Sequence, residues 1–487
     1  MRRALSFSPA LLSWPAAAIA ASGAAAVALR MPFMHAGLGP DEGGYAYVAQ
    51  QWAGGARLYG PAAWVDRPQG LMLAYRFLLT LGHSPWAIRL GAVVFGAAIT
   101  LLVGSIGWML KGPWAGAAAA AIYAVVGVGP HVQGFTFNGE IAAALPATAA
   151  IASALVWRRN GSLVWLLLAG LAAGIGPLMK QSGFDGLLVA AGVVASASSQ
   201  RRWRNVGVFT GAALVPFTAS ALHGLSVGWS NYWFAVAGYK LSAGSGVGQG
   251  FAHRFGPLAT SWIGARRDLE LLVLVALAGL GLTLLRKPRL WLPTGWLLAA
   301  FAGFNSASLY WPHYYVQLIP PLALLAGITA TSVPGRTFQL LVAAIAVAQV
   351  LPFLTKLDRM PRSEQEALVP YYRQYEDDAL VARAVRARSN LHDRIYALDS
   401  EADLYFLASR RSAFPYLWAH PLEEIPGAIG RLRALLDGKA RPRLVVIYRK
   451  PAAVDPSGAL GRILRDDYQF EERVPATDVS IFRSSSA

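Results

Sequence analysis

Residues 39–45 have the sequence Gly-Pro-Asp-Glu-Gly-Gly-Tyr, and they follow the first apolar run of the chain, residues 11–30. Ionisable groups close to hydrocarbon are strongly destabilising, so a chain that keeps few of them is expected to use them. Seven acidic side chains precede residue 355: Asp41, Glu42, Asp66, Glu140, Asp185, Asp268 and Glu270. The adjacent pair Asp41-Glu42 is therefore the first candidate for a functional site.

The composition is typical of a polytopic α-helical membrane protein. Hydrophobic residues make up 55% of the 487 and charged residues only 14%, whereas soluble domains contain about 25% charged residues. Several apolar runs approach the ~20 residues that a helix needs to cross a bilayer. The chain has no cysteine, which excludes disulfides and thiolate-bound metals.

About eleven apolar segments are predicted to span the membrane within a module of residues 1–354. They are residues 11–30, 87–110, 113–130, 139–157, 162–179, 183–199, 205–223, 269–285, 291–309, 314–332 and 337–354. The first could be a cleaved signal peptide, since residues 18–20 resemble a cleavage site. The many spans that follow favour a retained anchor. The module has two long outer loops, residues 31–86 and 224–268.

The distribution of charge predicts the orientation of the chain. Lysine and arginine gather in alternate loops, at Lys111, 158–159, 201–204, 286–289 and Arg336, and none of these loops contains an acidic residue. Because positive loops stay in the cytoplasm, the N-terminus is predicted to be cytoplasmic and Asp41 to lie outside a bacterial inner membrane. The same rule accounts for the net charge of +17 without a nucleic-acid partner.

Residues 355–487 hold the remaining acidic residues, and an odd number of spans places them outside the membrane. Residues 394–398 and 443–448 have the pattern of buried strands, and residues 479–482 could form an edge strand. Helical stretches are expected near 363–388 and 422–437. These elements predict a small extracytoplasmic α/β domain.

Residues 244–250 form a glycine-rich stretch within the second outer loop. No predicted strand precedes them, and their spacing does not match a dinucleotide-binding fingerprint. A flexible hinge is the better interpretation.

Asp41 is the predicted general base, a carboxylate that deprotonates an acceptor hydroxyl at the membrane surface. Glu42 is the second catalytic candidate because it adjoins Asp41. The alternative is that the pair stabilises the N-terminus of an interfacial helix beginning near Gly43. The two roles are compatible.

Asp66, Arg67 and Glu140 are predicted to bind substrate. Arg67 could bind a phosphate and Asp66 a sugar hydroxyl, or the two could form a surface ion pair of little energetic value. Glu140 stands at the outer start of a span, where it could bind a sugar or an arginine. The alternative for Glu140 is simple stabilisation of a helix N-terminus.

Five side chains could stabilise a departing phosphate: Arg67, Lys180, Arg266, Arg267 and His313. The alternative for Lys180 is a lysine that snorkels to water. Tyr314, which follows His313 in an aromatic segment, is a further candidate for substrate binding. The alternative for Tyr314 is a place in the aromatic belt at the membrane interface. The histidines show no HExxH-type spacing, so no metal site is predicted from them.

The order of these motifs along the chain, and their shared predicted side of the membrane, resemble the GT-C superfamily of membrane glycosyltransferases. The most similar branch is the bacterial one that is protein O-mannosyltransferase-like and aminoarabinose-transferase-like. The resemblance covers about residues 11–335. It rests on Asp41-Glu42, Asp66-Arg67-Pro68, Asn138-Gly139-Glu140, Lys180 with residues 181–183, and His313-Tyr314-Tyr315 with Pro320-Pro321. The chain departs from the family at residues 66–69, where relatives often have two prolines.

The resemblance implies an inverting hexosyl- or pentosyltransferase of cell-envelope glycan biosynthesis, with Asp41 as the base. The donor would be a polyprenyl-phosphate sugar, and the acceptor an extracytoplasmic glycan, lipid or protein. No cofactor is firmly predicted, but a divalent cation held by Asp41, Glu42 and Glu140 stays open because some relatives use one.

Two other classes of function remain as alternatives. A transporter or flippase of lipid-linked glycans usually has ionisable groups near the bilayer midplane and repeat symmetry. Here the carboxylates lie near span ends, and the sequence shows no detectable repeat. The third alternative is a non-catalytic protein of envelope assembly.

Overall fold

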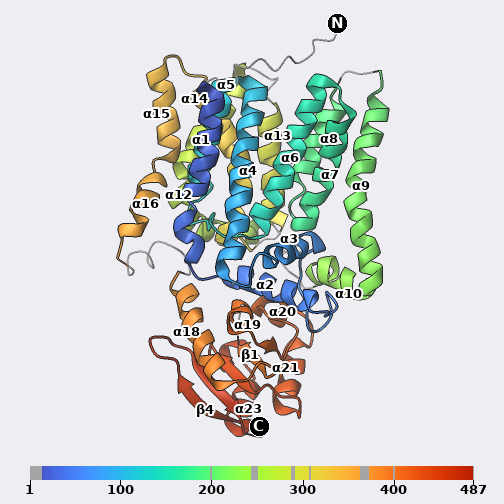
Figure 1. Ribbon diagram of the computed structural model, residues 1–487, viewed down its shortest axis with the longest axis vertical. Helices are drawn as coiled ribbons and strands as arrows, with labels where there is room; N and C mark the ends of the chain where they lie inside the picture. The colour runs from blue at the N-terminus through green and yellow to red at the C-terminus, as the bar shows by residue number, and fades with distance from the viewer. Residues whose placement is uncertain are drawn as a thin grey trace.

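The chain forms a bundle of long helices with a smaller α/β domain at one end (Figure 1). The computed structural model describes residues 14–197, 200–242, 251–286, 291–306, 309–361, 372–398 and 401–485. The proposed glycine hinge at 244–250 lies outside these residues.

Each predicted span overlaps a helix of the bundle. These helices are α1 (Trp14–Ala28), α4 (Pro85–Lys111), α5 (Pro113–Val126), α6 (Gly139–Asn160), α7 (Leu163–Met179), α8 (Asp185–Ala195), α9 (Arg202–Val227), α12 (Phe251–Arg286), α13 (Trp291–Ser306), α14 (Ile319–Ala330) and α15 (Arg336–Val347). By length and composition, four segments of the described chain can cross a membrane: Trp14–His35, Pro85–Lys111, Gly139–Asn160 and Arg202–Val227. The total of eleven spans stays a prediction.

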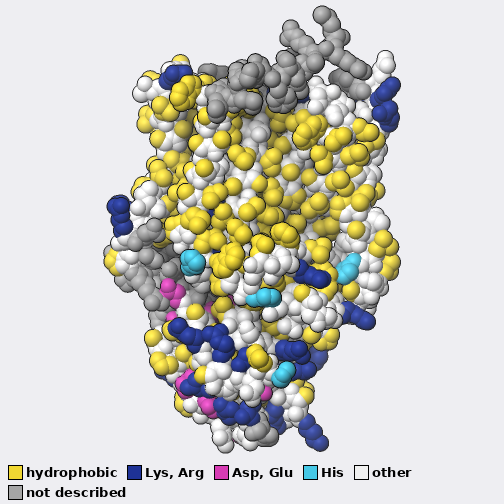
Figure 2. All heavy atoms as spheres, viewed as in Figure 1, with side chains coloured by type: hydrophobic (Ala, Val, Ile, Leu, Met, Phe, Trp, Pro, Cys, Tyr) yellow, Lys and Arg dark blue, Asp and Glu magenta, His cyan; other side chains and the backbone are white. Residues whose placement is uncertain are grey.

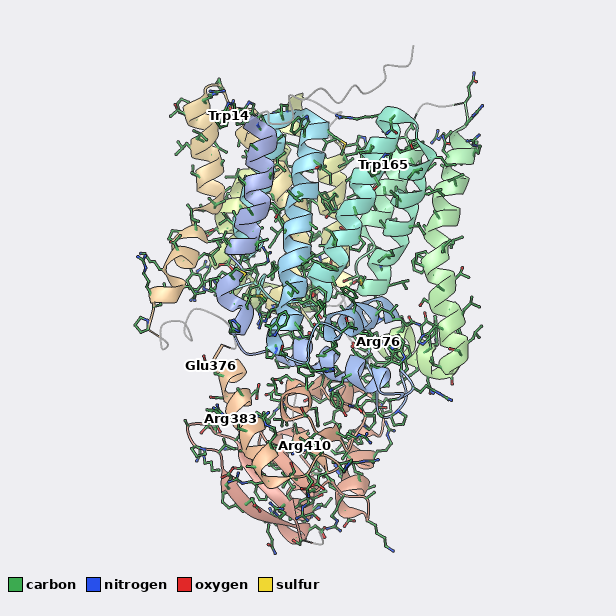
Figure 3. The ribbon with its side chains drawn as sticks, viewed as in Figure 1. Trp14, Arg76, Trp165, Glu376, Arg383 and Arg410 are labelled. Carbon is green, nitrogen blue, oxygen red and sulfur yellow. The ribbon has the colours of Figure 1, made fainter. Side chains whose placement is uncertain are left out.

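The surface of the bundle separates apolar from charged side chains. Apolar side chains cover its middle, whereas lysine and arginine gather at its ends and on the α/β domain (Figure 2). Trp14 and Trp165 lie toward the end remote from that domain, and Arg76 lies near it (Figure 3). An apolar band between polar ends is the pattern that a lipid bilayer requires.

The first outer loop contains helices η1 (Met31–His35), α2 (Pro40–Ala53) and α3 (Gln69–Leu79). Helix α2 begins at Pro40, earlier than the expected start near Gly43. Proline suits the first helical position, because its fixed φ is already helical and it needs no N–H partner there. Asp41 and Glu42 consequently lie in the first turn, where negative charge stabilises a helix.

The second long loop, predicted as residues 224–268, is more helical than expected. After α9 come α10 (Trp229–Trp233), the π-helical turn η2 (Phe234–Gly238) and α11 (Tyr239–Ser242), and α12 begins at residue 251. The predicted span began only at residue 269. The reason is that a change in hydropathy marks the edge of a membrane, while a helix can continue beyond it through polar residues. The short helix η3 (Pro312–Leu318) leads into α14 on the same side, and α16 (Leu351–Lys356) and η4 (Leu357–Arg359) follow α15.

The α/β domain contains a five-stranded sheet of order β2-β1-β3-β5-β4. Strand β1 (Arg394–Leu398) is parallel to β2 (Arg411–Ser412) and β3 (Leu444–Ile447), whereas β5 (Ser480–Ser484) is antiparallel to β3 and β4 (Tyr468–Arg473). The helices are α18 (Tyr372–Arg388), α19 (Asp403–Ala408), α20 (Ala419–Glu424), α21 (Ala428–Asp437), α22 (Pro451–Val454) and α23 (Ala459–Asp467).

Two expectations for this domain were wrong in detail. Strand β5, predicted at the edge, lies inside the sheet because β4 adds outside it. The helix expected over 422–437 is divided into α20, which ends at Glu424, and α21, which begins at Ala428. Ile425 is extended, as the residue before a proline tends to be, and Gly427, with a φ of 74°, is the N-cap of α21.

The domain contacts the bundle through α2. A Cβ added to Gly43 would lie 2.2 Å from Cβ of Asp403, and one added to Gly44 would lie 2.7 Å from Cβ of Ala402. The backbone N–H of Ser412 donates to the Tyr47 hydroxyl at 2.8 Å. Helix α2, with Asp41 in its first turn, is therefore held between the bundle and the domain.

Candidate active site

Asp41 and Glu42 are adjacent in α2 but have different surroundings. Glu42 is buried: its Oε2 lies 3.0 Å from Nη2 of Arg89, and its Oε1 accepts the N–H of Phe137 at 2.8 Å. Burial raises the pKa of Glu42, while Arg89 and the backbone N–H groups partly oppose that shift. The side chain of Asp41 is 31% exposed. Of the pair, Asp41 is the carboxylate that a substrate can reach.

Asp41 faces His313. Nε2 of His313 lies 3.6 Å from Oδ2 of Asp41 and 4.0 Å from Oε1 of Glu140. Its Nδ1 lies 3.2 Å from Oε1 of Gln133. Burial lowers the pKa of His313, and the two carboxylates oppose that shift. Helix η3 thus brings a histidine between carboxylates of α2 and α6.

Glu140 and Lys180 form a buried ion pair. The side chain of Asn138 caps α6 by accepting the N–H of Glu140 at 3.2 Å, which fixes the first turn. Nζ of Lys180 also lies 3.6 Å from the centre of the Tyr314 ring, a cation–π contact. Burial lowers the pKa of Lys180, and Glu140 opposes that shift. Lys180 is 5% exposed, so it does not snorkel to water.

Asp66 is bound by two cations. Its Oδ2 lies 2.7 Å from Nη1 of Arg67 and 3.2 Å from Nζ of Lys240. Burial alone would raise the pKa of Asp66, but the two positive charges outweigh burial and lower it to about 2. Burial lowers the pKa of Lys240 to about 8, although Asp66 opposes the shift. Gln181 supports this group by donating to the carbonyl of Asp66 at 2.7 Å.

Arg67 is close enough to act electrostatically on Asp41 and Glu140, so the two groups of ion pairs form one charged cluster. We call it the α2 cluster: Asp41, Asp66, Arg67, Glu140, Lys180, Lys240 and His313. They come from the first outer loop, the start of α6, the turn after α7, α11 and η3. Among the three carboxylates of the cluster, Asp41 has the longest distance to its nearest cationic partner, 3.6 Å to His313. Chemically, the cluster combines an accessible carboxylate with cations that are suited to an anion.

Two predicted cations are not part of this cluster. Arg266 and Arg267 are exposed on α12 and form no ion pair with it in the part of the chain that the structure describes. The three carboxylates considered for a divalent cation do not converge either, because Glu42 is bound by Arg89 and Glu140 by Lys180. Among the described residues, no group of three or more histidines and carboxylates could hold a metal ion.

Lys240 was missed by the sequence reasoning. The signal was available, because the charge pattern predicts few lysines on the side of the membrane that carries the carboxylates. Arg89 was missed for another reason: it lies inside an apolar span, and its partner Glu42 is distant in sequence.

Comparisons with known proteins agree with this architecture. Residues 66–223 match the family described as dolichyl-phosphate-mannose-protein mannosyltransferase (PMT_2). The structure is similar to ArnT from Cupriavidus metallidurans in the apo state, with a TM-score of 0.63 at 16% identity over 98% of both chains. For ArnT bound to undecaprenyl phosphate, the TM-score is 0.61 at 16% identity, covering 96% of this chain and 97% of that one.

A third similar structure is the archaeal oligosaccharyltransferase AglB from Archaeoglobus fulgidus, in complex with an inhibitory peptide and a dolichol-phosphate. Its TM-score is 0.55 at 11% identity, covering 97% of this chain and 74% of that one. The comparison with curated proteins yields no match. The chain therefore shares the fold of these structures, which is the fold expected from its resemblance to the GT-C superfamily.

Proposed function

We propose that the protein is a polyprenyl-phosphate-dependent glycosyltransferase that moves a sugar to an extracytoplasmic acceptor hydroxyl with inversion. The observation that carries the proposal is the α2 cluster, in which a partly exposed carboxylate adjoins several buried cations. Solved proteins of the same fold include one bound to undecaprenyl phosphate and one in complex with a dolichol-phosphate. Both are the kind of lipid phosphate that the proposed reaction releases.

Asp41 is the proposed general base. It takes the proton of the acceptor hydroxyl as the acceptor oxygen forms a bond to the anomeric carbon of the sugar. The bond between that carbon and the phosphate oxygen breaks, and its electron pair leaves with the polyprenyl phosphate. His313, 3.6 Å from Asp41, is suited to orient the carboxylate.

Arg67, Lys180 and Lys240 are the proposed phosphate ligands. The leaving phosphate gains negative charge as the bond breaks, and fixed positive charges stabilise the transition state more than the ground state. A lipid phosphate is already a good leaving group, so the mechanism needs no strong general acid. Asp66 and Glu140 hold these cations in place before the donor binds.

Orientation and localisation are part of the proposal. Predicted cytoplasmic loops meet at the end of the bundle remote from α2: Nη2 of Arg159 donates to the carbonyl of Met109, and Nζ of Lys111 donates to that of Ile328 at 3.1 Å. By the positive-inside rule this end is cytoplasmic, which favours an extracytoplasmic α2 and α/β domain in a bacterial inner membrane.

The test is substitution of Asp41 by asparagine in a deletion strain that carries the gene on a plasmid. We expect Asp41→Asn to reduce transfer by about 10²-fold or more, measured by profiling lipid-linked and envelope glycans. Glu270→Gln is the matched control, because Glu270 is an exposed carboxylate of α12. A transporter or an assembly protein would keep its glycan profile in the Asp41→Asn strain, and that result would overturn the proposal.

A further inference from the structure

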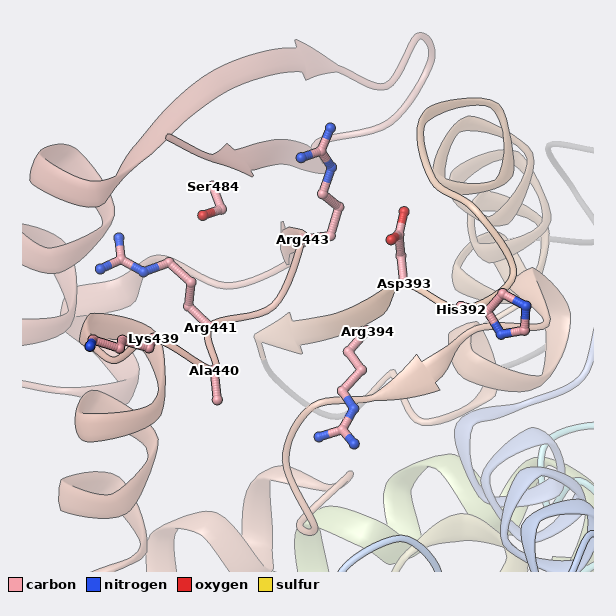
Figure 4. Close-up of a pocket in the computed structure, with 8 residues that line it drawn as sticks. All are labelled: His392, Asp393, Arg394, Lys439, Ala440, Arg441, Arg443 and Ser484. Carbon is pink, nitrogen blue, oxygen red and sulfur yellow. The ribbon is translucent and has the colours of Figure 1, made fainter. Parts of the chain in front are cut away.

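The α/β domain has a groove that the proposed reaction does not use. It lies at the amino ends of β1 and β3, has a volume of about 690 Å³, and is lined in part by Asp393, Arg394, Lys439, Arg441, Arg443 and Ser484 (Figure 4). This volume is within the ~300–1,000 Å³ of typical ligand sites. Four of the lining side chains are cations and one is a carboxylate.

Most of the positive charge in this groove is not neutralised. Arg441 pairs with Asp467 at 2.7 Å, whereas Arg394, Lys439 and Arg443 form no ion pair within the described part of the chain. Nearby carboxylates already have other partners, since Arg483 binds Glu471 and Arg388 binds Glu472. A concave surface with excess charge of one sign concentrates ligands of the opposite sign.

The lining defines the chemical class of the ligand. Guanidinium groups bind phosphate or carboxylate through paired hydrogen bonds. No tryptophan, tyrosine or phenylalanine lines the groove, and its one ring is the small imidazole of His392, so it offers little surface on which an uncharged sugar could stack. The groove therefore suits the charged groups of a ligand rather than its sugar faces.

The position of the groove argues against the headgroups of the surrounding bilayer. Strands β1 and β3 are parallel, so their amino ends lie at one edge of the sheet and their carboxyl ends at the other. The residues after the carboxyl end of β1, Ala402 and Asp403, contact α2. A five-residue strand spans about 16 Å, so the groove lies at the other end of β1 from these contacts, although Arg394 is still close enough to act electrostatically on Tyr47 of α2.

We propose that this groove binds the phosphate or carboxylate groups of an anionic glycan, which is the acceptor of the transferase. The inference rests on the proposed function and adds the class of acceptor to it. A glycan bound at both the groove and Asp41 must reach from the amino end of β1 to the first turn of α2, so the acceptor is longer than a single sugar.

The test measures binding by the full chain in nanodiscs of zwitterionic lipid. The probe is a fluorescent oligogalacturonide, a carboxylated glycan, and neutral dextran of equal length is its uncharged counterpart. We expect Arg394→Gln/Arg443→Gln to weaken oligogalacturonide binding by about 10-fold or more. The matched control is Arg462→Gln/Arg465→Gln, which removes the same charge from exposed positions of α23. Equal losses in both variants, or equal binding of dextran, would overturn the proposal.

Two further experiments complete the test. One distinguishes a glycan from a lipid as the bound anion, and the other distinguishes failure of the acceptor inference from failure of the proposed function. Binding of phosphatidylglycerol vesicles through Arg394 and Arg443, without binding of the glycan, would assign the groove to lipid and overturn the inference. In the complemented strain, the groove variant should lower the amount of modified glycan, and an unchanged amount would refute the acceptor assignment. If Asp41→Asn leaves the modification intact, the proposed function fails, whereas the binding result still stands because it needs no turnover.

Discussion

At the scale of single residues, the Glu140–Lys180 pair combines a structural and a proposed functional role. Both side chains are buried, and removing one partner of a buried pair leaves the other charge uncompensated. We expect Lys180→Met to lower the free energy of unfolding by about 3–5 kcal/mol and to abolish transfer. Thermal unfolding and glycan profiling of the same variant measure the two effects.

The double variant Lys180→Met/Glu140→Gln separates these roles. Replacing both charges removes the uncompensated group, so stability should return close to the wild-type value. Transfer should stay lost, because the proposed phosphate ligand is missing. Recovery of transfer together with stability would mean that Lys180 has only a structural role.

The sequence pattern predicts Asp41 as the base but leaves Glu42 as a second catalytic candidate. Adjacent residues of a helix point about 100° apart, so one of the pair enters the α2 cluster while the other meets Arg89. Which one does so depends on the start of α2 and on how the helix packs. Both are set by tertiary contacts, such as the N–H of Phe137 on Glu42, which no local pattern records.

At the scale of elements, the contact between α2 and α19 depends on Gly43. Alanine favours a helix over glycine by about 1 kcal/mol, so Gly43→Ala would stabilise α2 on its own. In the protein, the added Cβ would lie 2.2 Å from Cβ of Asp403, and α2 must shift. A displacement of about 1 Å can reduce a reaction rate by ~10²-fold, and we expect a loss of that order in transfer.

The control for this substitution is Gly211→Ala in α9, where an added Cβ meets nothing within 4 Å. That variant should transfer sugar at the wild-type rate. A Gly43→Ala variant with full activity would show that the position of α2 does not depend on the α/β domain.

A second prediction at this scale concerns two buried carboxyl groups, Asp378 of α18 and Asp403 of α19. Burial raises the pKa of Asp403 from 3.8 to about 8, and the negative charge of the nearby Glu401 adds to this shift. Burial and the charge of Asp403 raise the pKa of Asp378 as well, and Asp377 and Tyr448 also face it. Between about pH 4 and pH 8, the folded state thus binds more protons than the unfolded state.

Stability should therefore decrease as the pH rises from about 4 through 8. Thermal unfolding of the full chain at several pH values measures this slope. Asp403→Asn should reduce the dependence of stability on pH, because the amide does not titrate. Asp466→Asn, at an exposed position of α23, should keep the wild-type slope.

At the scale of the whole molecule, the helical bundle was predictable because apolar length is a local property of the sequence. The strands 394–398 and 443–448 were predictable for the same reason, and β1 and β3 confirm them. The contact between the domain and α2 was not predictable. It joins Gly43 to Asp403 through close backbone approach, which depends on the assembled fold. The α2 cluster was partly predictable, since its members share one side of the membrane in the charge pattern.

That shared side is itself a prediction, and the absence of cysteine from the chain makes it directly testable. Ala53 is exposed at the end of α2, and Asn160 is exposed at the end of α6, at the opposite end of the bundle. Single variants Ala53→Cys and Asn160→Cys each introduce one thiol. Because positive loops stay in the cytoplasm, a membrane-impermeant maleimide should label Ala53→Cys in spheroplasts and Asn160→Cys only after lysis. The reverse result would put Asp41 in the cytoplasm, where it could not meet an extracytoplasmic acceptor.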